Sequence, residues 1–371
     1  MKKLICTILA ASMLLSVAPL TFAEETEIAD KQFQNMALTI DGAIDYALEH
    51  NLGIQQKEAA LKKSKHEETQ ARRTYNDYNS MGTSIEEALI ESGYYYRAAQ
   101  IQAASAERAL AAQKNALITE IKLRFYTCLN YKAKIQSAAE SLTSAQNNYT
   151  YAQTKYEQGA ISALELNTFK SAVTSAQTSY NTVVRNYELA VRYLKYGLNI
   201  PQTTEITPVG EFVLPELTYA DDKTAIELAK NQNSYLSISE GRELAELRFK
   251  IANGWYSSNE LGYSIELENY TANMSAYEVS EAELEYGIYS AYSGLLTVKE
   301  TLGLMNESLD LLRQSMEAAH LQFELGMITA DEYVEYEQKY YNAKNDYIDT
   351  QLTYYTTALQ YITAYNGSAD I

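Results

Sequence analysis

Apolar residues recur at alternating spacings of three and four through two long stretches of the chain, one around Gly159 and one around Gly326. Before Gly159 these positions are Ile135, Ala138, Leu142, Ala145, Tyr149, Ala152 and Tyr156, and after it they continue from Leu166 to Leu194. The stretch around Gly326 repeats this register from Leu302 to Tyr361. A sustained period of 3.5 residues predicts long helices in left-handed coiled-coil packing. At about 1.5 Å per residue, a helix over 163–198 would reach about 54 Å.

Each of the two glycines marks a turn between two such helices. Gly159 and Gly326 can adopt the left-handed conformation that ends a helix, and a capping box then starts the next helix. The two boxes pair Ser162 with Glu165 and Thr329 with Glu332. So short a connection predicts antiparallel hairpins. Two interpretations of these tips stay open: a turn required only by hairpin geometry, or a docking surface to which Ile161 and Ile328 contribute.

The last helix carries a second apolar stripe beside the first. Its positions are Ile348, Leu352, Tyr355, Leu359 and Ile362. One stripe suffices for a two-helix hairpin, so a second stripe predicts a neighbour on the other side. That neighbour is either the other hairpin of this chain or a hairpin of another subunit. Helices with two seams can tile side by side into a curved sheet or a closed cylinder.

Beyond the first 23 residues, the prolines of the chain are gathered in one place and divide it into two halves. Pro201, Pro208 and Pro215 are the only ones there and lie within fifteen residues of one another. Because proline cannot continue a helix, residues 199–217 are predicted to link two halves, 24–198 and 218–371. Two short motifs recur across the link: 43–51 matches 225–233 at an offset of 182, and 156–165 matches 323–332 at an offset of 167. These matches predict an internal duplication.

The N-terminus predicts export. Lys2 and Lys3 precede an apolar run over residues 4–20, and Ala23 supplies a small residue at its end. This is the pattern of a secretory signal peptide over residues 1–23, with an uncleaved membrane anchor as the alternative. The mature chain would keep one cysteine, Cys128, so packing alone must hold it. We expect a cell-envelope location, in the periplasm or associated with an outer membrane.

Composition and motif content argue against nucleic-acid binding and against enzymatic activity. The 371 residues include 48 acidic and 30 basic side chains, a balance that argues against nucleic-acid binding. No phosphate-binding glycine loop or dinucleotide fingerprint is present. His50, His66 and His320 are scattered, and Cys128 lies among apolar helical positions. We therefore predict no enzymatic activity, no cofactor and no metal. The 33 tyrosines fall largely on the heptad seams, where a ring is buried while its hydroxyl can reach water.

The order of these motifs resembles the TolC family of outer-membrane efflux components. Residues 38–51 resemble the family's N-terminal signature, 156–162 its hairpin turn, and 341–344 its final helix. The resemblance implies a homotrimer in which four long helical segments per subunit form a twelve-helix tunnel. It also implies that the hairpin tips face a periplasmic adaptor and an inner-membrane transporter. By this resemblance the partner-docking tip residues are Gly159, Ile161, Ser162 and Glu165 with Gly326, Ile328, Thr329 and Glu332.

The sequence departs from the family where membrane strands are expected. A closed barrel needs strand pairs of about 9–11 residues each. The window 75–96 contains residues 84–90, which are typical of a capped helix, and the window 253–275 offers one alternating stretch over 263–268. We therefore predict an all-α fold of long antiparallel coiled-coil hairpins from two internal repeats, a TolC-like α-barrel without a β-barrel.

Two functions remain open from the sequence. One is a TolC-like component of an envelope export or efflux system, a trimeric helical conduit whose tips dock an adaptor or pump. The other is a non-conducting coiled-coil scaffold or spacer of the cell envelope. A conduit should be a closed trimer, whereas a spacer could be a monomer or dimer.

Overall fold

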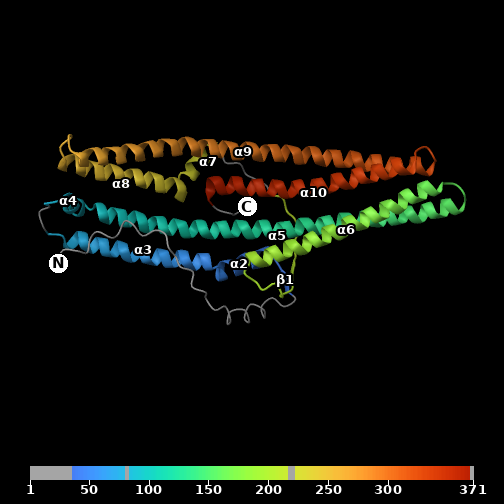
Figure 1. The fold of residues 1–371 in the computed structure, drawn as a ribbon, viewed down its shortest axis with the longest axis horizontal. Helices are drawn as coiled ribbons and strands as arrows, with labels where there is room; N and C mark the ends of the chain where they lie inside the picture. Colours follow the sequence, from blue (N-terminus) through green and yellow to red (C-terminus); the bar gives the residue numbers. More distant parts are fainter. Residues whose placement is uncertain (1–35, 80–82, 216–221, 368–371) are drawn as a thin grey trace.

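The computed structural model describes residues 36–79, 83–215 and 222–367, and over these it is a long rod of helices (Figure 1). The first half contains β1 (Met36–Leu38), α2 (Ile40–His50), α3 (Leu52–Asp77), α4 (Ile85–Glu91), α5 (Tyr94–Glu157) and α6 (Ala163–Gly197). The rest contains β2 (Ile206–Pro208), α7 (Asp222–Ala229), α8 (Asn233–Trp255), α9 (Leu261–Glu324) and α10 (Ala330–Asn366). The predicted signal peptide lies outside the described residues.

The long helices form two antiparallel hairpins of matching size. Helices α5 and α9 each span 64 residues and begin 167 positions apart. Helix α6 spans 35 residues and its counterpart α10 spans 37. Both hairpins turn at the same end of the rod, on the right in Figure 1. The predicted fold class is confirmed: the structure is mostly helical, and its long helices pair as the heptad pattern requires.

Buried positions repeat between the halves at the two offsets found in the sequence. Fully or nearly fully buried counterparts are Ala43 with Ala225, Ala47 with Ala229, Ile121 with Ile288, Cys128 with Leu295, and Leu194 with Tyr361. They lie in two hydrophobic clusters of like construction, one around α2, α5 and α6 and one around α7, α9 and α10. The same backbone positions therefore form the core in each half although the side chains differ.

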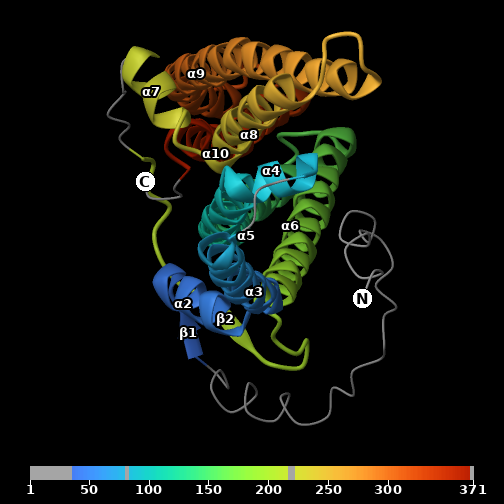
Figure 2. The same cartoon turned by 90° about the vertical axis from the view of Figure 1, so that its left-hand side faces the viewer.

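Helix α10 joins the two hairpins through both of its apolar stripes. Tyr354, Ala358 and Tyr361 pack toward α9 and α7. Tyr355 and Leu359 pack instead against residues of α5, including Tyr126, whose ring centroid lies 4.1 Å from that of Tyr355. The neighbour predicted from the second stripe is thus the chain's own first hairpin. The rod is a thin curved wall in which α5 packs against both α6 and α10, and α10 packs against α9 (Figure 2).

The described residues include a small sheet that the sequence pattern did not predict. Strands β1 and β2, of three residues each, pair in parallel with Met36 opposite Ile206 and Leu38 opposite Pro208. The backbone N–H of Val209 also donates to the carbonyl of Leu38 over 2.9 Å. This pair ties the segment before α2 to the proline-bearing link. Runs of three residues are too short to show a period.

The described residues at the end of the rod opposite the tips are mostly helical. Helix α4 forms where it was predicted, and the Ser84 hydroxyl accepts from the backbone N–H of Glu87. The strand candidate over 263–268 is wrong, because those residues form the first turns of α9. The Arg248 guanidinium donates to the Glu266 carboxylate over 2.8 Å, and this ion pair fastens the start of α9 to α8. A six-residue alternation cannot outweigh such contacts.

Among the described residues, no helix has a stretch apolar enough to cross a membrane.

Candidate docking surface at the hairpin tips

The two hairpin tips have the same backbone geometry. Gly159 and Gly326 both have a φ of 72°, in the left-handed region that favours glycine. At the first tip the N–H of Ala160 donates to the carbonyl of Lys155 over 2.8 Å, and the N–H of Gly159 donates to the carbonyl of Tyr156 over 2.9 Å. The second tip repeats both bonds. This is a Schellman motif, which satisfies carbonyls that the end of a helix leaves free.

Both predicted capping boxes form. The Ser162 hydroxyl accepts from the N–H of Glu165 over 3.2 Å, and the Glu165 carboxylate accepts from the N–H of Ser162 over 2.8 Å. Thr329 and Glu332 make the same two bonds at the same distances. Bonds from the Thr329 backbone and hydroxyl hold the pKa of the Glu332 carboxyl below its ordinary value. The geometry of the tips therefore follows from their sequence.

A shared aromatic cluster holds the two tips side by side. Phe169 on α6 lies with its ring centroid 5.3 Å from that of Phe323 on α9, and Phe323 stacks on Tyr333 of α10 at 5.6 Å. All three side chains are buried. Ile161 and Ile328 are half-buried and pack against this cluster. The structure thus brings all the predicted tip residues together at one end of the rod, but it turns the two isoleucines inward.

The large apolar residues that face solvent at the tips were not singled out from the sequence. Leu164, Leu325 and Met327 are 75%, 76% and 70% exposed. Leu325 and Met327 line a groove between the tips that also contains Phe323 and Ile161. Because these side chains flank a turn, the heptad period says nothing about them. Their signal was the presence of large apolar residues beside a glycine in a turn, where polar residues are usual.

Above the tips, the seam between the hairpins becomes polar. The Glu337 carboxylate is buried and accepts from the Ser144 hydroxyl over 2.6 Å and from the Asn148 amide over 2.9 Å. The Thr168 hydroxyl donates to the Asp331 carboxylate over 2.8 Å. Charged and neutral partners on opposite hairpins thus fix how the hairpins meet. Such cross-seam bonds contribute specificity to a contact that small side chains alone would leave loose.

The surroundings of the three histidines and of Cys128 are those of packing or surface residues. His50 stacks on Tyr46 with ring centroids 4.2 Å apart, and His66 is exposed on α3. His320 lies 3.6 Å from a Glu324 oxygen. Burial raises the pKa of the Cys128 thiol to about 12, so it is poorly suited to act as a nucleophile. Within the described residues, no group of three or more potential ligands could hold a metal ion.

The repeat leaves one seam buried and its counterpart exposed. Phe169 and Phe323 meet inside the chain and are 1% and 5% exposed. Their repeat counterparts, Tyr336 and Tyr156, are 37% and 44% exposed. Likewise Ser137 and Ser144 face α10 in the inner seam, whereas their counterparts Leu304 and Leu311 lie exposed on α9. The exposed counterparts therefore lie on α9 along the rod (Leu304 and Leu311) and on α5 and α10 at the tips (Tyr156 and Tyr336). Helix α6 packs mainly against α5, and α9 packs mainly against α8 and α10, so α6 and α9 form the two open edges of the chain.

The fold is that of TolC-family outer-membrane channels, at low sequence identity. A membrane protein from Pseudomonas aeruginosa aligns over 97% of this chain and 97% of its own, with 14% identity and a TM-score of 0.71. The outer membrane protein VceC from Vibrio cholerae aligns over 89% of this chain and 97% of its own (12% identity, TM-score 0.72). The MtrE outer membrane channel of Neisseria gonorrhoeae aligns over 89% of this chain and 90% of its own, with 12% identity and a TM-score of 0.70. No family model and no curated protein matches the sequence.

Proposed function

We propose that this protein is a TolC-like component of an envelope export or efflux system, which assembles as a homotrimer into a helical conduit. The observation that carries the proposal is the pair of open edges on α6 and α9. A chain whose two edges match a seam already formed within it can repeat that seam head to tail, and such contacts generate a ring when the rotation closes. Three chains of two hairpins would give a twelve-helix wall.

The edges are chemically suited to such a contact. Exposed apolar residues on α9 include Leu304, Leu311 and Tyr286, which are 68%, 64% and 75% exposed. Leu189 and Tyr193 are exposed on α6. Apolar residues at heptad spacing on an isolated helix face are typical of a coiled-coil surface that lacks its partner. At the tips, by the repeat, Tyr156 on α5 of one chain would meet Tyr336 on α10 of the next, as Phe323 meets Phe169 within the chain.

The tips would dock a periplasmic adaptor or an inner-membrane transporter. Two turns held at one level by a shared cluster present a rigid end surface, and their exposed leucines and methionine can enter an apolar groove of a partner. The predicted docking residues at Gly159 and Gly326 would then set the shape of this surface, while Leu164, Leu325 and Met327 would supply most of its apolar contact. The glutamates of the capping boxes keep both turns in place.

Assembly is tested by the molar mass of the mature chain from light scattering, together with negative-stain images viewed along the rod. The proposal expects the mass of three chains and a ring with a central hole. A monomeric rod would contradict the conduit and favour the non-conducting spacer.

Docking is tested separately by complementation of a deletion strain of the native host, scored as growth in the presence of toxic small molecules. The double variant Leu325→Ser with Met327→Ser should lose complementation while keeping its mass and helicity. The matched control is Gln158→Ser with Ala160→Ser, at the counterpart positions of the first tip. Equal complementation by both variants would count against docking through the second tip.

A further inference from the structure

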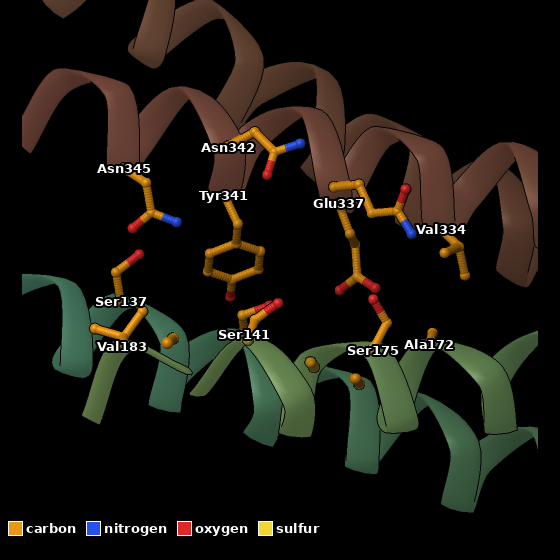
Figure 3. A pocket seen from close by; sticks show the side chains of 15 residues that line it. Ser137, Ser141, Ala172, Ser175, Val183, Val334, Glu337, Tyr341, Asn342 and Asn345 are labelled. Atoms are coloured by element: carbon orange, nitrogen blue, oxygen red, sulfur yellow. The ribbon is translucent and has the colours of Figure 1, made fainter. Parts of the chain in front are cut away.

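A polar groove lies between α10 and the first hairpin, in the seam above the tips (Figure 3). It has a volume of about 250 Å³ and is lined by serines and alanines of α5 and α6 opposite polar side chains of α10. The buried Phe169 and Tyr333 lie below it, and Tyr126 and Tyr355 pack across the seam above it. Exposed Ser175 and Asn342 mark its mouth. The groove is therefore a polar stretch of the seam, with an aromatic contact between the hairpins at each end.

The deep end of the groove holds polar atoms that lack partners. The Ser137 side chain is 1% exposed, and its hydroxyl has no hydrogen-bond partner. The Asn345 carbonyl oxygen faces it from α10 and is also buried and unpartnered (Figure 3). Burying such atoms without a hydrogen bond costs free energy. The Ser137 hydroxyl can both donate and accept, and the Asn345 oxygen can accept, so an inserted amine would satisfy both atoms.

The other end of the groove carries a negative charge. Both oxygens of Glu337 accept hydrogen bonds from the Asn148 amide over 2.9 Å, and one also accepts from Ser144. Among the described residues that line this groove and its extension toward Asp331, none is lysine, arginine or histidine. A buried carboxylate without a cationic neighbour favours a cation as ligand.

The spacing of these two ends defines the length of the ligand. Glu337 and Asn345 lie eight positions apart on α10, which is about 12 Å along a helix. Between them the floor is formed by Ala138 and Ala176, and the Tyr341 hydroxyl points toward Ser141 (Figure 3). A single metal ion cannot contact both ends. An extended molecule with an apolar stem and amines along its length can.

The duplication shows that this groove is particular to the inner seam. The counterparts of Glu337, Tyr341 and Asn345 on α6 are Lys170, Thr174 and Thr178, and the counterpart of Ser137 on α9 is the exposed Leu304. The carboxylate is thus replaced by a cation and the orphan hydroxyl by an apolar side chain. Hairpin packing as such does not require the polar set, since the repeated position lacks it.

We propose that this groove binds a linear aliphatic polyamine. One ammonium group lies on the Glu337 carboxylate, the methylene stem runs along the alanines of α5 and α6, and a second amine donates to the Asn345 oxygen and the Ser137 hydroxyl. The site belongs to a single chain and does not rest on the proposed assembly.

The test is isothermal titration calorimetry of spermidine into the mature full-length chain at about 0.15 M salt, where weak binding to a surface rich in carboxylates is screened. The proposal expects one site per chain. Glu337→Gln should weaken binding about ten- to a hundredfold, because a charge-assisted bond is lost, and Ser137→Ala about two- to tenfold. Asp346→Asn removes the same charge from an exposed position of α10 and should leave the affinity unchanged.

A second variant, which blocks the groove sterically, tests the proposal even if Glu337→Gln fails to fold. Ser175→Leu narrows the mouth at an exposed position without changing any charge, and it should abolish binding while circular dichroism and the melting temperature stay as in the wild type. Absence of saturable binding would overturn the proposal. So would equal weakening by Asp346→Asn and Glu337→Gln, or undiminished binding by Ser175→Leu, because each would show that spermidine binds the acidic surface only.

Discussion

The inner seam, where α10 meets the first hairpin, and the outer edges on α6 and α9 are built from the same repeat but have opposite character. In the inner seam Phe169 and Phe323 are buried, and the positions above them carry Ser137, Ser144 and Glu337. The counterpart positions carry leucine on α9, lysine on α6 and, at the tips, tyrosine on α5 and α10, and the leucines and tyrosines are exposed. One seam is complete and partly polar, and the other is apolar and open.

The difference illustrates how two equivalent surfaces of a repeated backbone can differ in polarity. A repeated backbone supplies two equivalent surfaces, and only one of them can be covered within the chain. The covered seam can hold polar groups in fixed positions because its partner is always present. In the proposed assembly the open seam would attract a partner by burying apolar area, which is the non-directional driving force of most protein association.

The largest effect is expected from charges on the open seam. Leu304→Asp with Leu311→Asp places two carboxylates at heptad positions of α9 and should reduce the mass in light scattering from three chains to one, because burying unpaired charges is costly. Helicity should not change, since both positions are exposed in the single chain. Glu300→Asp with Glu307→Asp, which changes neither charge nor hydrophobicity on the same helix, is the control.

The next effect compares the buried phenylalanine with its exposed counterpart. Phe323→Ala should lower the free energy of unfolding by about 3–5 kcal/mol, as is typical when a buried aromatic ring is removed. Tyr156→Ala should cost less than about 1 kcal/mol in a dilute single chain, because Tyr156 is 44% exposed whereas Phe323 is 5% exposed. Urea unfolding followed by circular dichroism measures both. Equal losses at low protein concentration would contradict the assignment of the two seams.

A smaller and symmetric effect is expected at the capping boxes. Ser162→Ala and Thr329→Ala each remove one hydroxyl that caps a helix, and each should lower the free energy of unfolding by about 1 kcal/mol. Because the two boxes have the same bond lengths, the two losses should agree within about 0.5 kcal/mol. A clear difference between them would mean that contacts beyond the box distinguish the tips.

The smallest effect is a pH dependence at the second tip. The pKa of Glu332 is lower in the folded chain than in the unfolded one, because the carboxylate accepts from Thr329. Its contribution to stability is therefore present above the ordinary glutamate pKa and is lost as pH falls through the lowered value. Melting curves from neutral to acidic pH should show a smaller acid-induced decrease for Glu332→Gln than for the wild type. Identical slopes would contradict this contribution.

Much of the fold could be predicted because it depends on local patterns. The heptads over 135–194 and 302–361 predicted α6, α10 and the parts of α5 and α9 nearest the tips, and each tip follows from a glycine and a capping box within seven residues. The choice between a buried and an exposed seam could not be predicted, because Phe323 and Tyr156 occupy the same position of the period. Nor could the groove be predicted, since Ser137 and Glu337 are 200 positions apart. The docking role of the tips stays a prediction.

The central claim is that the inner seam is repeated between subunits. It is tested most directly by the double variant Tyr156→Cys with Tyr336→Cys, treated with a short bismaleimide cross-linker. The native Cys128 is buried and should not react. The account predicts covalent dimers and trimers from the double variant and only monomers from either single variant. Monomers alone from the double variant, at concentrations where light scattering is measured, would contradict it.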